Sequence, residues 1–221
     1  MQPSPHTISL LLADARLPSG GHAQSSGVEP ALLAGMPVAD VPAFLRARAR
    51  TTGMVDAGTA VLARHAALDC IPMASIERAW AARTPSRAIR DASKYLGRGL
   101  LRLAGRIWPE VRSSLDDLDE SPPRPLVLGA IAAHAGIDAE SLVRLTVYDD
   151  MACAVAALLK LEPGDPAHGV AMVLEACSSI EPHVAAVSSI TSAHQIPAAS
   201  APQSEAWSEA HALTTRRLFR A

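Results

Sequence analysis

The feature that most constrains the fold is a long apolar helix pattern that follows Asp138. Its apolar residues recur at steps of three and four positions: Leu142, Leu145, Tyr148, Ala152, Val155 and Leu159. This spacing places them on one face of an α-helix. Asp138 is a good N-cap, and the Pro-Gly-Asp-Pro segment at 163–166 ends the pattern. We therefore expect a helix at 139–162 in the centre of the core.

The composition favours helices throughout the chain. Hydrophobic residues make up 49 % of the sequence, most of them Ala and Leu, whereas aromatic residues make up only 3 %. Ala and Leu lose little side-chain freedom in a helix, and the aromatic residues that favour strands are nearly absent. A length of 221 residues suits one domain, with at most a long tail. The prediction is an all-α, single-domain helical bundle of roughly ten helices.

Gly, Pro and capping residues set the expected helix boundaries. Asp40 and Asp56 are the predicted N-caps of two early helices, and residues 196–202 (IPAASAP) are typical of a linker before a polar tail helix. The predicted helices cover these approximate ranges: 7–15, 25–33, 41–53, 56–68, 85–107, 126–135, 139–162, 167–180, 182–194 and 204–219.

The helix predicted at 85–107 has an apolar stripe and a basic stripe side by side. The apolar stripe consists of Ile89, Ser93, Leu96, Leu100, Leu103 and Ile107. The basic stripe consists of Arg87, Arg90, Lys94, Arg98, Arg102 and Arg106. The basic stripe has three interpretations: a solvated face, a surface for an acidic protein, or a surface for nucleic acid. Gly97, Gly99 and Gly105 each cost about 1 kcal/mol against Ala, which suggests that they permit close packing.

The sequence contains no motif of a known catalytic site. It lacks a P-loop, GxGxxG, HExxH, CxxC and GxSxG, and its eight histidines are scattered. The closest approach to metal-ligand spacing is Asp149 with Cys153 at i,i+4, but a buried core cysteine explains Cys153 better. Asp149 and Asp150 are neighbours that point in different directions, so polar or capping roles are expected. We therefore predict no enzyme; a helical metal enzyme is the weakest hypothesis.

The remaining sequence features favour a cytoplasmic protein. The three cysteines are far apart, as in a reducing compartment. The N-terminus lacks the basic region of a signal peptide, and no apolar run approaches the ~18 residues of a membrane span. The net charge of −2 is too small to indicate a nucleic-acid-binding protein. We expect no membrane and no nucleic-acid partner.

Two motifs at opposite ends of the chain resemble one protein family. Residues 17–29 (LPSGGHAQSSGVE) resemble the opening signature of the urease accessory protein F family, and residues 217–221 (RLFRA) resemble its C-terminal Arg-Leu-Phe-x-Ser. His211 stands six residues before Arg217, as the family's tail histidine does. Three weaker similarities lie between the ends. The first is Pro125 to Gly129 followed by Gly136, the second is Ser93 and Gly97 followed by Leu100-Leu101, and the third is residues 156–161.

The resemblance implies a non-catalytic maturation factor for urease. Members of the family are all-α and often dimeric, and they bind a D-type (also called H-type) accessory protein and a G-type accessory GTPase. Their assembly docks on apo-urease and couples GTP hydrolysis to nickel transfer. By resemblance, this chain is a scaffold that binds no cofactor stably and handles nickel transiently. Residues 196–221 are then a linker and a C-terminal partner-binding tail.

The resemblance also assigns roles to single residues. Pro18, Gly20, Gly21 and Gly27 form structural turns, and His22 is a candidate to line the nickel passage. The residues implied to bind partners are Glu29, Lys160, His211, Arg217, Leu218, Phe219 and Arg220. Apolar residues at the end of a chain have few elements left to bury them, so Leu218 and Phe219 are expected to be exposed until a partner binds.

The chain departs from the family pattern at four places. His22 stands where an aromatic residue is usual, Gln24 where a histidine is frequent, and Ala221 in place of the terminal Ser. The segment after Lys160 also differs. The competing hypothesis is a helical DNA-binding regulator that uses the basic stripe from Arg87 to Arg106, and a steeply salt-dependent gel shift would favour it.

Overall fold

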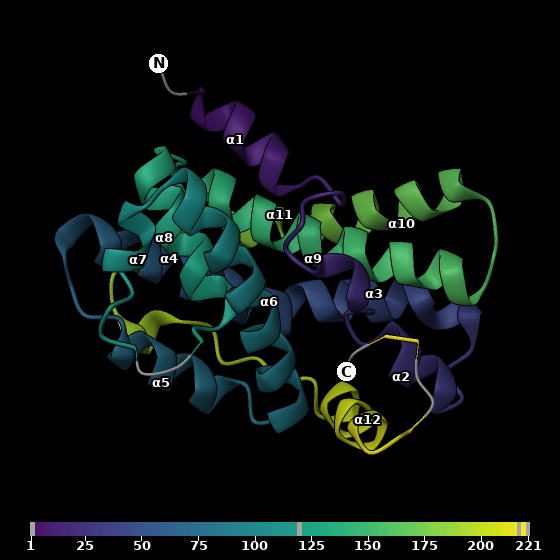
Figure 1. The fold of residues 1–221 in the computed structure, drawn as a ribbon. Helices are drawn as coiled ribbons and strands as arrows, with labels where there is room; N and C mark the ends of the chain where they lie inside the picture. Colours follow the sequence, from purple (N-terminus) through teal and green to yellow (C-terminus); the bar gives the residue numbers. More distant parts are fainter. Residues whose placement is uncertain (1–2, 119–120, 216–217, 220–221) are drawn as a thin grey trace.

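The structure, a computed structural model, describes residues 3–118, 121–215 and 218–219, and in these residues the regular elements are all helical (Figure 1). The all-α prediction is confirmed. The α-helices are α1 Pro5–Leu12, α2 Val28–Leu33, α3 Val41–Arg50, α4 Thr52–Asp69, α5 Ala74–Arg83, α6 Arg87–Ile107, α7 Glu110–Ser113, α8 Arg124–Ala135, α9 Ala139–Leu161, α10 Pro166–Ser178, α11 Glu181–Ser188 and α12 Pro202–Ala212. The short 3₁₀ helices are η1 Gly21–Ala23, η2 Val38–Asp40 and η3 Ala193–Gln195.

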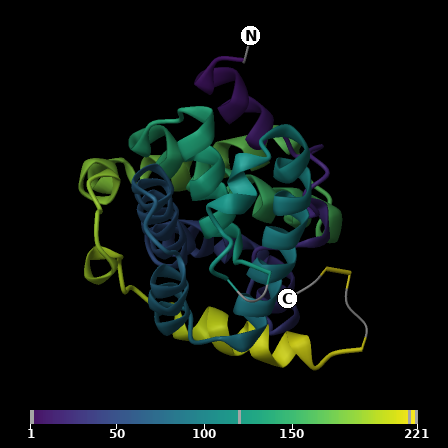
Figure 2. The ribbon, with the colours of Figure 1, turned by 60° about the vertical axis from the view of Figure 1, so that its left-hand side comes forward.

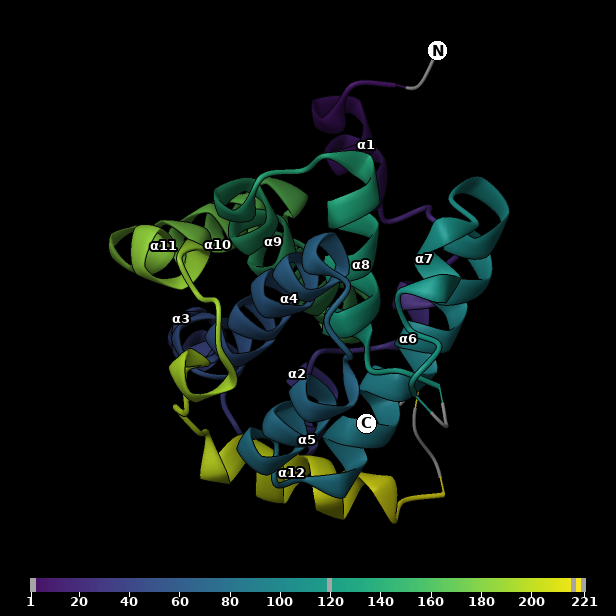
Figure 3. The same ribbon diagram turned by 90° about the vertical axis from the view of Figure 1, so that its left-hand side faces the viewer.

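Helices α4, α8 and α9 form the centre of the core, and the other helices pack around them (Figure 3). Most residues of α8 are buried, and α9 buries residues along its whole length. Gly129 of α8 makes the crossing with α4 unusually close, because an added Cβ would lie 2.7 Å from the Cβ of Ala63. A helix this deeply buried is apolar on most of its sides, which explains the Ala-rich sequence of α8.

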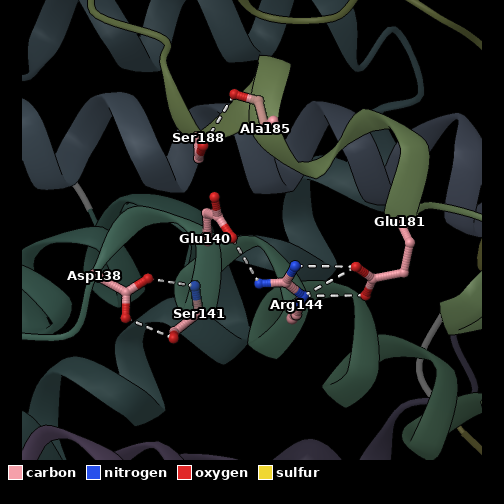
Figure 4. Close-up of polar contacts among 7 residues, drawn as sticks. All are labelled: Asp138, Glu140, Ser141, Arg144, Glu181, Ala185 and Ser188. Carbon is pink, nitrogen blue, oxygen red and sulfur yellow. Dashed lines mark hydrogen bonds and ion pairs between the residues drawn. The ribbon is translucent and has the colours of Figure 1, made fainter.

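The predicted central helix at 139–162 is confirmed as α9, and Figure 4 shows how its first turns are fixed. The carboxylate of Asp138 accepts the backbone N–H of Ser141 at 2.8 Å and so caps the helix as expected. Arg144 then bridges Glu140 on α9 and Glu181 on α11 at 3.1 and 3.0 Å. The prediction that Tyr148 belongs to the core is wrong. Its side chain is 42 % exposed, because no other helix covers this part of the α9 surface in the described residues.

Helix α6 matches the prediction at 85–107, but its apolar stripe is only partly buried. Ser93 and Leu100 are buried, whereas Ile107 at the end of the helix is 47 % exposed. Two glycines of α6 do permit close packing, although the neighbours are loop carbonyls rather than a helix. An added Cβ would collide with the Pro122 carbonyl at Gly97 and with the Ser19 carbonyl at Gly99.

Several other boundaries differ from the prediction. Helix α4 begins at Thr52, so Asp56 lies inside it and is not its N-cap. Asp40 occupies the N-cap of α3, but its side chain makes no capping hydrogen bond there. Helix α5 was not predicted, because its apolar pattern is short and buries only Ile76 and Trp80. Helix α12 ends at Ala212, so the expected tail helix does not continue to 219.

In the described part of the chain, no single helix is long and apolar enough to span a membrane. The pair α10 and α11 reaches that length and composition together, with a bend of 51° between its two helices.

Candidate functional site

Leu218 and Phe219 of the tail contact helix α2, which also packs against α12 (Figure 1). Figure 2 shows α12 along the lower edge of the molecule. Glu29 in the first turn of α2 is buried, and its carboxylate accepts two consecutive backbone N–H groups of the tail. The N–H of Leu218 lies 2.7 Å from Oε1, and the N–H of Phe219 lies 2.9 Å from Oε2. A buried carboxylate needs such donors, because burial without partners is costly. Glu29 therefore fixes the backbone of the tail in place.

His211, at the end of α12, approaches the same carboxylate. Its Nε2 lies 3.1 Å from Oε2 of Glu29, a distance typical of an ion pair, and its side chain is almost completely buried. Within the described residues neither ring nitrogen makes a hydrogen bond of good geometry. The contact places the end of α12 next to the first turn of α2.

Phe219 and Leu218 face opposite environments. Phe219 is only 4 % exposed, and the ammonium of Lys160, near the end of α9, lies 5.3 Å from the centre of its ring. This distance is within the range of a cation–π contact. Leu218 is 64 % exposed. The expectation that both residues are exposed is therefore wrong for Phe219, because its backbone bonds to Glu29 of α2 and its ring lies under Lys160 of α9.

The segment before α2 is a series of turns that depends on two glycines. Gly20 and Gly27 have φ angles of 92° and 82°, in the left-handed region that favours glycine. Gly21 has no positive φ and starts η1, so of the two adjacent glycines only Gly20 adopts the left-handed conformation. Pro18 lies in the preceding turn. The side chain of His22 lies outside the described part, as do Arg217, Arg220 and Ala221.

A cavity of about 350 Å³ extends inward from Phe219 and Lys160. Charged side chains from three helices line one wall. Arg48 of α3 donates to both carboxylate oxygens of Asp150 at 2.7 and 3.0 Å, and Arg124 of α8 donates to Asp149 at 2.6 Å. Asp149 and Asp150 therefore do point in different directions, as expected, but both line the same cavity. The two ion pairs join α3 and α8 to α9.

Asp56 of α4 is a further carboxylate of this wall that the sequence did not single out. Its Oδ1 accepts a hydrogen bond from the indole N–H of Trp80 at 2.8 Å. Burial raises the pKa of Asp56 to about 6, and the neighbouring Asp150 adds to the effect against the opposing Trp80 hydrogen bond. Burial also raises the pKa of Asp149, whereas the Arg124 guanidinium opposes that change. Asp56 therefore changes its charge near pH 6.

Cys153 and Gln24 complete the polar wall. The thiol of Cys153 donates to the carbonyl oxygens of Gly21 and Gln24 at 3.3 and 3.4 Å, and burial raises its pKa to about 11. The thiol therefore stays protonated at neutral pH and joins α9 to the turn segment. Gln24 is 6 % exposed and lines the cavity, and its Nε2 has no hydrogen-bond partner among the described residues. No group of three metal-ligating side chains occurs in the described part of the chain.

Comparison with known proteins assigns the chain to a family. The family model UreF matches residues 37–177, a range that includes neither terminal motif. The urease accessory protein UreF of Mycobacterium marinum is 41 % identical over 175 residues, which cover 77 % of this chain and 81 % of that protein. The protein of the same name from Mycolicibacterium vanbaalenii is 39 % identical over 182 residues, covering 80 % and 82 %. The chain belongs to the UreF family.

Proposed function

We propose that this protein is a urease accessory protein that acts as a non-catalytic scaffold in the cytoplasm during nickel insertion into apo-urease. In this proposal its partners are a D/H-type accessory protein and a G-type GTPase, and the chain forms a homodimer. Residues 1–221 form one domain with a partner-binding tail at 196–221. The proposal is supported by the family, and by the observation that Glu29, Lys160, His211 and Phe219 meet at one place.

The docked tail supports a role in binding the D/H-type protein. Large apolar side chains are exposed at the end of α2, at the end of α12 and in the tail: Leu33, Leu213 and Leu218. Helices α2 and α12 pack against each other, so this side of the molecule carries apolar surface from both ends of the chain. Exposed apolar surface of this kind is typical of a protein interface. The contacts of Glu29 set where Leu218 points.

The cavity supports transient handling of nickel as cargo. Nickel prefers imidazole to carboxylate ligands, so carboxylates suit passage of the ion rather than storage, and the wall supplies Asp56, Asp149 and Asp150. Two of these carboxylates are held by arginines, which weakens any binding, so an ion that enters is not retained. His22 belongs to the segment beside this cavity and is the further candidate for the path. No cofactor is bound stably in this proposal.

Co-purification of the D/H-type protein with tail variants tests the proposal. Each variant is co-expressed with the tagged partner: Leu218→Ala, Phe219→Ala and, as a control on the opposite end of α9, Glu140→Ala. We expect both tail variants to lose co-purification and the control to retain it, with unchanged helical circular dichroism in all three. Retention of the partner by both tail variants would overturn the assignment of the tail.

The role in urease maturation is tested separately by urease activity. Cells that carry apo-urease and the other accessory proteins are supplied with nickel, with and without this chain. We expect active, nickel-containing urease only when the chain is present. Equal nickel content of urease without the chain would refute the proposed function.

A further inference from the structure

The basic stripe of α6 is divided into two halves by its contacts. In the first half each cation has a partner: Arg87 lies 3.5 Å from Asp91, Arg90 donates to two backbone carbonyls, and Lys94 lies 2.9 Å from Glu77. In the second half, Arg98 lies over the ring of Tyr95 at 5.6 Å. Across the described ranges no carboxylate pairs with Arg98, Arg102 or Arg106, and all three are exposed.

A fourth guanidinium joins this second half from helix α7. An added Cβ at Gly105 would lie 3.1 Å from the Cζ of Arg112. The side chain of Arg112 therefore occupies the space that a side chain at position 105 would fill. On a helix, position 105 lies between the directions of Lys94 and Arg98. The small residue thus allows Arg112 to lie along the same face. We call Arg98, Arg102, Arg106 and Arg112 the arginine face.

The arginine face is unfavourable for the isolated chain. Arginines at i,i+4 repel each other and destabilise a helix, and this applies to Arg98 with Arg102 and to Arg102 with Arg106. Several other arginines pair with carboxylates of other helices, as Arg46 does with Glu175 and Arg144 with Glu181. A concentration on one short face of arginines that pair with no carboxylate of the described residues therefore indicates a surface that is satisfied by another molecule.

We infer that the arginine face binds an acidic helix of a protein partner. The guanidinium group matches a carboxylate with two parallel hydrogen bonds, which makes arginine frequent at protein interfaces. Residues four apart on α6 are separated by about 6 Å along the axis, and glutamates four apart on a second helix have the same separation.

Two observations favour an acidic protein over nucleic acid. The row from Arg98 to Arg106 is about 12 Å long, whereas tight binding of nucleic acid usually neutralises six or more phosphates over a longer path. The net charge of the chain is −2, which agrees with a local rather than a general anion-binding surface.

The experiment measures fluorescence anisotropy of labelled probes with the full-length protein at low salt. One peptide probe is a helix with glutamates four residues apart on one face. A second peptide has the same composition with the glutamates distributed around the helix, and a third probe is a DNA duplex. The protein variants are Arg98→Glu with Arg102→Glu, the same positions changed to Lys, and Arg50→Glu. Arg50 is exposed on α3 and serves as the matched control.

We expect the aligned peptide to bind more tightly than the distributed one. The double Glu variant should weaken its binding by about tenfold or more, the Lys variant should weaken it less, and Arg50→Glu should change it by less than about twofold. Equal binding of both peptides, or equal losses in the face variant and the control, would overturn the inference. Tighter binding of the duplex than of the aligned peptide would also overturn it and assign the face to nucleic acid.

Discussion

The substitution Glu29→Gln tests whether the Glu29 carboxylate holds the tail on the body of the protein. In the structure this carboxylate accepts the N–H groups of Leu218 and Phe219 and lies 3.1 Å from His211 Nε2. Glutamine has the same shape but only one acceptor oxygen. Its amide NH₂ would face the N–H of Leu218 in one orientation, and the N–H of Phe219 with the imidazole of His211 in the other. One charge-assisted hydrogen bond is therefore lost, and the other becomes a neutral one.

The size of the effect follows from these two hydrogen bonds. A hydrogen bond to a charged group contributes about 1.5–3 kcal/mol, and a neutral one about 0.5–1.5 kcal/mol. Losing the first and weakening the second removes roughly 2–4 kcal/mol from the docked state of the tail. Since 1.4 kcal/mol corresponds to a factor of ten, the ratio of docked to undocked tail should fall by about 30-fold or more.

Amide hydrogen exchange of the ¹⁵N-labelled protein measures this ratio directly at Leu218 and Phe219. We expect their protection factors to fall by about 30-fold or more in Glu29→Gln, while core amides of α9 keep theirs. Glu162→Gln, an exposed carboxylate just after α9, is the matched control and should leave both amides unchanged. Protection within about twofold of the wild type in Glu29→Gln would refute the role of the carboxylate.

Two further predictions concern the core and the cavity. The pKa of Asp56 is raised from 3.8 to about 6 in the folded protein, so the folded state binds this proton more tightly. Ionisation of Asp56 should therefore cost about 3 kcal/mol of stability, relative to a variant without this carboxylate, as the pH rises from about 4 to above 6. Asp56→Asn keeps an acceptor for Trp80 and removes the charge, so urea unfolding over this pH range should lack that loss; an identical pH dependence in both proteins would contradict the assignment. Gly129→Ala should destabilise the fold by about 1–3 kcal/mol or more, because the added Cβ would collide with the backbone of α4. The control Gly21→Ala should have little effect, because its added Cβ meets no atom within 4 Å. Equal urea midpoints for the two variants would show that α4 and α8 can separate at no cost.

The sequence by itself determined the helical class and most of the helices. Helix formation depends on residues within a few positions of each other, so the apolar steps of α9 and the Asp138 cap were sufficient to predict that helix. The same local logic failed where the pattern was short, as in α5, whose two buried residues are Ile76 and Trp80. It also failed at Asp56. The sequence alone does not show whether an aspartate stands at the start of a helix or inside it, and inside α4 Asp56 accepts a hydrogen bond from Trp80 of the neighbouring helix α5.

The motifs at the two ends of the chain identified the family, but only the tertiary structure brought those ends together. Glu29 and Phe219 are 190 positions apart, and their contact depends on how α2, α9 and α12 pack. The cavity wall likewise joins Arg48, Asp56 and Arg124 from three helices to Asp149 and Asp150. Periodicity predicts which face of a helix is buried but not which partner covers it. The pairing of charges, and the burial of Phe219, are therefore properties of the packed chain.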